Sequence, residues 1–305
     1  MSRLEEKLRS GEFVLTAELP TVDGGGLDAV RERVEPFADY VDAVNATDNT
    51  GARAHASSLA LAIALERLGV EPIMQLVCRD RNRLALQAAI VGASLHGIEN
   101  VLCLGGDPMK VGDEPEATPV HDLDTLGLLA AARGIGDGSY LSGRELAAPP
   151  LFLGAAETPA PPVEDRVARV REKAKAGAEF FQLQVSFEPA DLGRFLEAAG
   201  AETFFIPSIT IVRSARTLRF MDEKVPGISV PAAAIEKVER SSDEEKACLE
   251  LAADVAARTL EVPGVAGLHL IGFGRADGVA ELCRRVGIPT RLERETLGYG
   301  PALAV

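Results

Sequence analysis

Short apolar runs recur along the chain, and each is followed by a stretch with the apolar spacing of an amphipathic helix. One of the runs, IMQLV at residues 73–77, is suited to burial on both faces, as in a parallel sheet. Strands are predicted at residues 13–19, 40–46, 72–77, 100–104, 151–155, 180–185, 204–209 and 267–273. Helices are predicted at residues 27–38, 56–68, 83–96, 122–132, 163–176, 190–199, 214–221 and 277–286.

This alternation predicts an α/β fold with a mainly parallel sheet covered by helices. Because the chain holds eight strand–helix units, the pattern favours a closed (β/α)8 TIM barrel over an open sheet. Extra helices are predicted over residues 231–262, between strands 7 and 8. A nucleotide-binding open sheet would carry G-x-G-x-x-G after an early strand, but residues 19–26 read LPTVDGGG and are interpreted as a loop. No Pro/Ser-rich linker divides the chain, so residues 1–305 are predicted to form a single barrel domain.

Composition limits the compartment and the partners. The net charge of −14 disfavours nucleic acid, and any anionic ligand would need a local cation. The four cysteines form no C-x-x-C pair, which favours free thiols in a reducing compartment. The start of the chain has no signal-like segment, and no apolar run approaches the ~20 residues of a membrane span. The sequence therefore predicts a cytoplasmic protein with no nucleic acid and no membrane partner.

Candidate chemistry lies where the predicted strands end, because a barrel gathers these ends at one mouth. The chain lacks G-x-S-x-G and H-E-x-x-H, which disfavours hydrolysis through a covalent intermediate, and it offers no converging set of metal ligands. The polar residues at the strand ends are Glu18, the cluster at 45–49, Gln75, Arg79, Asp80, Asp107, Gln182 or Gln184, Ser208, Thr210 and His269.

Each of these residues has a chemical and a structural interpretation. A buried carboxyl such as Glu18 has a raised pKa and suits general acid catalysis, but it could equally form a salt bridge across the barrel. Asp107 follows two glycines that would let a ligand ring approach, or it caps a turn. The amide of Gln184 suits a heterocycle or is satisfied by backbone. His269 is either packed and hydrogen-bonded or lines the mouth.

Several short motifs in order resemble the methylenetetrahydrofolate reductase family, in particular the reductase-like domain that some bacteria fuse to a homocysteine methyltransferase. The motifs run from about residue 13 to 288 and so cover nearly the whole chain. They are ATDNTGAR at 46–53, LVCRDRN at 76–82, GDPMKVGD at 106–113, DLDTL at 122–126, KAKAGA at 173–178, VPGI at 225–228 and GVAGLHL at 264–270.

The resemblance implies a (β/α)8 barrel that reduces 5,10-methylenetetrahydrofolate to 5-methyltetrahydrofolate with FAD and NADH or NADPH, in one-carbon metabolism and methionine biosynthesis. It implies that Glu18 is the general acid and that Asp107 lies beside folate and flavin. Gln184 would bind the pterin, with Gln182 in its place if the register differs by two. A homo-oligomer is also expected. The cofactor contacts implied by the family are Asn45, Thr47, Gln75, Gly105, Gly106, Asp107, Thr118 and Lys173.

The chain departs from the family pattern on the flavin side. Gln75 stands where the family usually has a histidine, Gly105 stands in place of an arginine, and GAAETP at 154–159 replaces an aromatic and histidine segment. The sequence therefore predicts weak FAD binding, and some family members are thought to transfer hydride directly from nicotinamide. Two alternatives stay open: a folate-binding protein or partner subunit without reductase activity, and a pterin-dependent methyltransferase, for which no cobalamin or zinc-thiolate motif is present.

Overall fold

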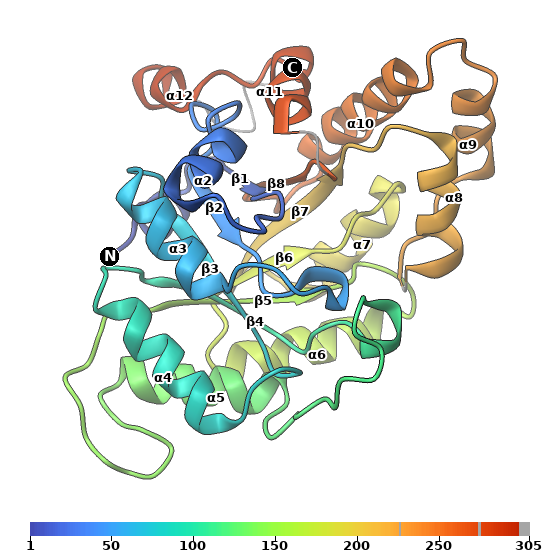
Figure 1. The fold of residues 1–305 in the computed structure, drawn as a ribbon. Coiled ribbons are helices and arrows are strands. Elements are labelled where there is room, and N and C mark those ends of the chain that lie inside the picture. Colours follow the sequence, from blue (N-terminus) through green and yellow to red (C-terminus); the bar gives the residue numbers. More distant parts are fainter. Residues whose placement is uncertain (226, 274–275, 299–305) are drawn as a thin grey trace.

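The computed structural model describes residues 1–225, 227–273 and 276–298. Eight parallel strands close into a barrel in chain order, from β1 to β8 and back to β1 (Figure 1). The (β/α)8 barrel predicted from the sequence is confirmed. The strands are β1 (Val14–Glu18), β2 (Ala43–Ala46), β3 (Pro72–Val77), β4 (Asn100–Leu104), β5 (Phe152–Glu157), β6 (Phe180–Leu183), β7 (Phe204–Thr210) and β8 (Gly267–Ile271).

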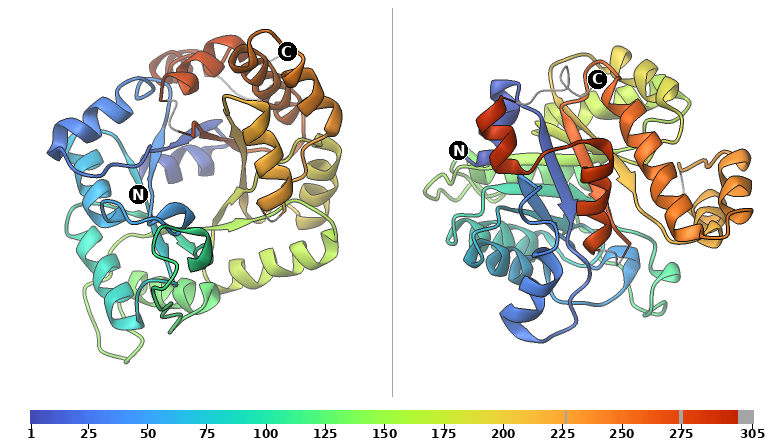
Figure 2. Two further views of the ribbon diagram at one scale, coloured as in Figure 1. Left: turned by 45° about the vertical axis from the view of Figure 1, so that its right-hand side comes forward. Right: turned by 90° about the horizontal axis from the view of Figure 1, so that it is seen from above.

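The helices form a ring around the strands (Figure 2). In the chain as described, α8, α9 and α10 all lie between β7 and β8, so the extra helices predicted there are present. None of the described helices is long and apolar enough to cross a membrane. The helices are α1 (Arg3–Ser10), α2 (Gly26–Val34), α3 (Ser58–Arg67), α4 (Arg83–Ser94), α5 (Thr125–Gly136), α6 (Val163–Ala176), α7 (Pro189–Ala199), α8 (Ala215–Lys224), α9 (Ala232–Glu239), α10 (Glu244–Leu260), α11 (Ala276–Val286) and α12 (Arg291–Leu297).

Side-chain caps explain several element boundaries. Helix α5 begins three residues later than predicted, because the Asp124 carboxylate accepts a hydrogen bond from the Gly127 N–H at 2.7 Å and caps the first turn. Ser57 and Asn82 cap α3 and α4 in the same way. Helices α1 and α12 were not predicted, since both lie outside the strand–helix alternation.

The apolar core has two parts. The larger part fills the space between the strands and the surrounding helices. The smaller part lies inside the barrel, where Leu4 and Leu8 of α1 pack against residues of β1 to β7 and close the N-terminal end. Phe152 and Phe180 stack there with ring centroids 5.0 Å apart. Gly154 is needed beside them, because a Cβ at that position would lie 2.3 Å from the Phe180 ring.

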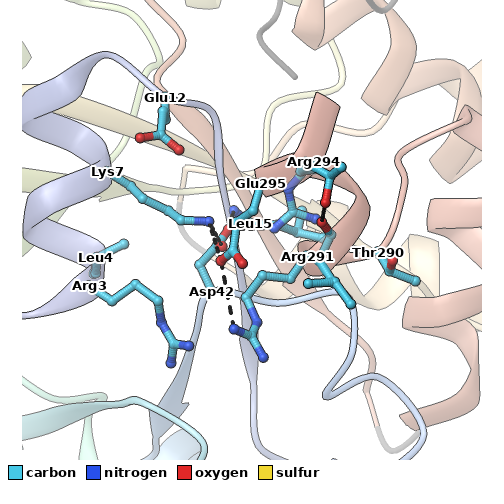
Figure 3. Close-up of polar contacts among 12 residues, drawn as sticks. Arg3, Leu4, Lys7, Glu12, Leu15, Asp42, Thr290, Arg291, Arg294 and Glu295 are labelled. Atoms are coloured by element: carbon cyan, nitrogen blue, oxygen red, sulfur yellow. Dashed lines mark hydrogen bonds and ion pairs between the residues drawn. The ribbon is translucent and has the colours of Figure 1, made fainter. Parts of the chain in front are cut away.

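A buried ion cluster joins both ends of the described chain to the barrel (Figure 3). Asp42 accepts hydrogen bonds from Lys7 Nζ at 2.8 Å and from Arg294 Nη2 at 2.6 Å. It also accepts one from the Leu15 N–H at 2.7 Å, while Lys7 pairs with Glu295 at 3.1 Å. The Asp42 cluster (Lys7, Asp42, Arg294 and Glu295) thus holds α1 and α12 against the strands. It lies near the starts of β1 and β2, away from the strand ends that form the mouth.

Candidate active site

A cavity of about 240 Å³ opens at the C-terminal ends of the strands. Part of its wall is apolar and is formed by Leu102, Leu104 and Ile271, so polar groups inside the cavity are partly shielded from water. Its polar lining residues are Glu18, Gln75, Glu157, Thr158, Arg169, Gln182, Gln184, Ser208 and His269. Six of the strand-end residues picked out by sequence therefore line one cavity, whereas the cluster at 45–49, Arg79, Asp80, Asp107 and Thr210 do not.

Glu18 ends β1, where it lies opposite Asn45 of β2 in the parallel register. Burial raises the pKa of Glu18 from the usual 4.5 to about 7, and the negative charge of Asp107 adds to the rise. No ion pair to Glu18 exists among the described residues, so the structure gives no support for the cross-barrel salt bridge. A carboxyl with this pKa can hold or release a proton near neutral pH.

An amide and imidazole network forms the floor of the cavity. Asn45 Nδ2 donates to Gln182 Oε1 at 2.7 Å, and Gln182 Nε2 donates to Asn45 Oδ1 at 3.0 Å. His269 Nδ1 lies 2.9 Å from Thr16 Oγ1 and 3.4 Å from Gln182 Nε2. Burial lowers the pKa of His269 to about 3, so the ring stays neutral. Both interpretations of His269 apply, because its ring is buried and hydrogen-bonded and it also lines the cavity at the mouth.

Two further amides reach the cavity above this floor. Gln184 lies just past β6 and two residues beyond Gln182, and the period of two along an extended chain brings both to the cavity. Gln184 Oε1 accepts from the Val185 N–H at 3.0 Å, which leaves its NH₂ group able to donate. Gln75 of β3 is 7% exposed and makes no side-chain hydrogen bond within the described part of the chain. Gln75 and Gln184 can therefore bind a ligand that carries hydrogen-bonding groups.

Asp107 sits on the exposed loop that follows β4, and two hydrogen bonds hold it there. Its Oδ2 accepts from the Gly51 N–H at 2.9 Å, and its carbonyl oxygen accepts from Arg79 Nη1 at 3.0 Å. Gly106 has a φ of 92°, and a Cβ there would lie 2.9 Å from Arg79 Cβ. The glycine is therefore required by packing against Arg79. Asp107 acts on Glu18 through its charge.

Arg79 organises the loops around the mouth, a role that sequence reasoning missed. It is 2% exposed, and its guanidinium donates to the Asp80 carboxylate at 2.6 Å and to the Asn49 carbonyl at 3.2 Å. Together with the bond to Asp107, these contacts join the loops after β2, β3 and β4. The charged sequence RDR directly after β3 was the signal for this role.

Lys173 and Glu157 form a second buried ion pair beside the cavity. Lys173 Nζ donates to Glu157 Oε2 at 2.8 Å and to the Ala156 carbonyl at 2.6 Å, and burial lowers the pKa of Lys173. Arg166 and Arg169 also approach the Glu157 carboxylate, at 3.7 and 3.4 Å. Glu157 thus faces three cations, an arrangement that the sequence did not indicate. Arg169 lines the cavity and is half exposed.

The other predicted cofactor contacts do not line the cavity. Thr47 is buried, and its hydroxyl makes no hydrogen bond among the described residues. Thr118 is exposed on the loop between β4 and α5, Gly105 is half-buried at the end of β4, and Lys173 is bonded to Glu157. Of the eight residues predicted to contact the cofactor, Gln75 alone lines this cavity.

No group of three or more His, Cys, Asp or Glu side chains suited to a metal ion occurs in the described ranges. The fold and cavity define a (β/α)8 barrel in which a buried carboxyl of raised pKa, Glu18, shares one cavity with the amides of Gln182 and Gln184. The chain belongs to the methylenetetrahydrofolate reductase family, whose sequence model matches residues 3–287. Helix α12 lies beyond the matched residues.

Two known proteins resemble this chain, one in sequence and one in fold. Methylenetetrahydrofolate reductase 2 of Schizosaccharomyces pombe is 24% identical over 238 residues, which are 72% of this chain and 36% of that protein. This chain thus spans only about a third of that relative. A Clostridium thermocellum protein, described as binding two copies of 5-methyl-5,6,7,8-tetrahydrofolic acid, matches in structure with a TM-score of 0.65 and 15% identity. The match covers 92% of this chain and 96% of that one, and it shows a shared fold.

Proposed function

We propose that this protein reduces 5,10-methylenetetrahydrofolate to 5-methyltetrahydrofolate, with NADH or NADPH as the source of hydride. The observation that carries the proposal is Glu18, a carboxyl with a pKa of about 7 at the cavity of a barrel of this family. A general acid must be protonated at working pH, and an ordinary glutamate would not be.

The proposed reaction transfers one proton and one hydride to the folate. Glu18 donates its proton to N10 of the folate, the bond between N10 and the methylene carbon breaks, and its electron pair stays on N10. The product is an iminium in which the methylene carbon is double-bonded to N5. Hydride from the reduced nicotinamide adds to this carbon and gives the N5-methyl group and oxidised nicotinamide. Glu18 is left as a carboxylate and regains a proton from solvent.

The remaining cavity groups would bind and orient the substrate. The amides of Gln75 and Gln184 match the donor and acceptor groups on a pterin ring. Arg169 is the half-exposed cation of the cavity lining. The chain as a whole carries a net charge of −14, which disfavours anionic ligands. The positive charge of Arg169 would attract anionic groups locally, such as the folate glutamate or the nicotinamide phosphates.

The test is an assay of reduced nicotinamide oxidation with methylenetetrahydrofolate, without flavin and then with added FAD. The expected result is turnover without flavin, lowered by a factor of about 100 or more in Glu18→Gln. Absence of turnover with either nicotinamide, with and without FAD, would refute the reductase. If 5-methyltetrahydrofolate still bound in that case, the second candidate, a non-catalytic folate-binding protein, would follow. The folate-binding structural neighbour favours that second candidate.

A further inference from the structure

The floor of the cavity contains a histidine whose two ring nitrogens have different surroundings. His269 is 3% exposed on β8, and it lines the cavity together with Gln182. Its Nδ1 lies within hydrogen-bond distance of both Thr16 Oγ1 and Gln182 Nε2. Its Nε2 makes no hydrogen bond within the described part of the chain. One nitrogen is therefore used by the protein and the other is left for the cavity.

The partners of Nδ1 determine where the ring proton lies. As the Gln182 amide is oriented in the structure, its NH₂ group faces Nδ1, and because this group can only donate, Nδ1 accepts in this arrangement. The Thr16 hydroxyl can donate to the same nitrogen. A neutral imidazole that accepts at Nδ1 carries its proton at Nε2. His269 is neutral at ordinary pH, because burial lowers its pKa to about 3.

The tautomer of His269 is coupled to the amide pair beside it. Asn45 and Gln182 exchange two hydrogen bonds, and the pair would be equally satisfied if both amides were turned by 180°. If both amides were turned, Gln182 Oε1 would face Nδ1 and the ring proton would have to lie there. The tautomer of His269 and the orientations of Gln182 and Asn45 are therefore coupled, so that fixing one fixes the others.

We propose that His269 is a positioning residue that orients the Gln182 amide through Nδ1 and presents an N–H donor at Nε2 to a lone pair of the bound pterin, a carbonyl oxygen or a ring nitrogen. This inference rests on the proposed function for the identity of the ligand. The Nε2–H of His269 is then a fixed hydrogen-bond donor in the cavity, and it favours ligands that place a hydrogen-bond acceptor at that point.

The first test needs no ligand. In protein labelled with ¹⁵N-histidine, the His269 signals are identified by their loss in His269→Asn. The expected spectrum shows a protonated Nε2 and an unprotonated Nδ1 that do not titrate at neutral pH. Thr16→Val is expected to shift the Nδ1 signal. The opposite tautomer, with the proton at Nδ1, would overturn the proposal whatever the protein binds.

The second test measures the dissociation constant of 5-methyltetrahydrofolate. In His269→Asn the side-chain oxygen can replace Nδ1 but nothing replaces the Nε2 donor, so affinity is expected to fall about 10-fold, as for one lost hydrogen bond. In His269→Gln the positioning contact is lost, so Gln182→Ala is expected to cost much less than in the wild type. The matched control is His96→Gln, which changes an exposed histidine at the end of α4.

The outcomes separate this inference from the proposed function. An unchanged affinity in His269→Asn, or additive effects of the His269 and Gln182 variants, would contradict the positioning role while leaving folate binding intact. Thermal unfolding of each variant shows whether a loss of affinity reflects a loss of fold. If the wild-type protein bound no 5-methyltetrahydrofolate, the proposed function would fail, the claim of a pterin ligand would fail with it, and the NMR result would decide the positioning role.

Discussion

Glu18→Gln is expected to make the protein more stable and less active at the same time. The side chain of glutamine has the shape of a protonated glutamate but cannot ionise. In the wild type, burial and Asp107 raise the pKa of Glu18 from 4.5 to about 7. The folded state thus disfavours the carboxylate, and above pH 7 this costs about 3 kcal/mol of folding free energy, at ~1.4 kcal/mol for each pH unit between the two pKa values.

The effect has a defined pH window. Below pH 4.5 the carboxyl is protonated in both the folded and the unfolded chain, so the substitution changes little. Between pH 4.5 and about 7 the folded state binds more protons than the unfolded state, and wild-type stability falls as pH rises. Above pH about 7 the variant gains the full amount. At ~2 cal/mol/K of unfolding entropy per residue, this corresponds to about 5 °C in melting temperature for 305 residues.

The assay is thermal or urea unfolding of wild type and Glu18→Gln at about pH 5 and about pH 8. Glu116→Gln serves as the matched control, since it removes an exposed glutamate from the loop after β4. The stability difference between Glu18→Gln and wild type should grow with pH, while that of the control should not. A variant that is equally stable or less stable than wild type at pH 8 would show that folding does not raise the pKa of Glu18. The same result would remove the physical basis for its role as general acid.

Three further predictions concern the mouth, the Asp42 cluster and flavin. Asp107→Asn removes a charge that raises the pKa of Glu18, so the fall of kcat/KM with rising pH should move to lower pH. An unmoved profile would show that the charge of Asp107 does not affect the pKa of Glu18. Asp42→Asn removes the carboxylate that Lys7 and Arg294 share, and it leaves the buried Arg294 without an anionic partner, so it should cost about 3–5 kcal/mol in urea unfolding. A loss under about 1 kcal/mol would show that the cluster does not hold α1 and α12 against the barrel. FAD should bind weakly, because two lost polar contacts cost roughly 1–3 kcal/mol each. One flavin per chain after extensive dialysis would contradict this.

The barrel could be predicted from sequence because its strands are short apolar runs set between helical spacings. Helices α1 and α12 could not be predicted in this way, since their positions depend on tertiary contacts. Helix α1 is held by fitting Leu4 and Leu8 into the end of the barrel. Helix α12 is held by Arg294, whose partner Asp42 lies 252 residues earlier in the chain. Neither contact leaves a periodic signal in its own segment.

The residues of the candidate site also differ in how far the sequence alone could predict them. Glu18, Gln75, Gln182 and Gln184 were found because they stand on or just after strands, where the period of two and the shared mouth bring them together. The partners of Lys173 and Asp107 could not be found, because they depend on how loops and helices settle around the mouth. Lys173 forms an ion pair with Glu157, and the Gly51 N–H donates a hydrogen bond to the Asp107 carboxylate. These local contacts decide whether a residue stays available to a cofactor.

The polar interior of the barrel explains why the cavity, rather than another hollow of the protein, is the candidate site. Buried polar groups cost free energy unless they are paired, and the floor residues Asn45, Gln182 and His269 pair with one another. Gln75, Nε2 of His269 and the proton of Glu18 are left without protein partners in the described chain. Such unpaired groups lower stability, so a ligand that pairs with them gains affinity from the same groups that the fold leaves unsatisfied. Binding should then also raise the melting temperature, and once the free ligand exceeds its dissociation constant, the stabilisation should grow with the logarithm of ligand concentration. The hydrogen bonds that the fold leaves unmade are thereby linked to recognition.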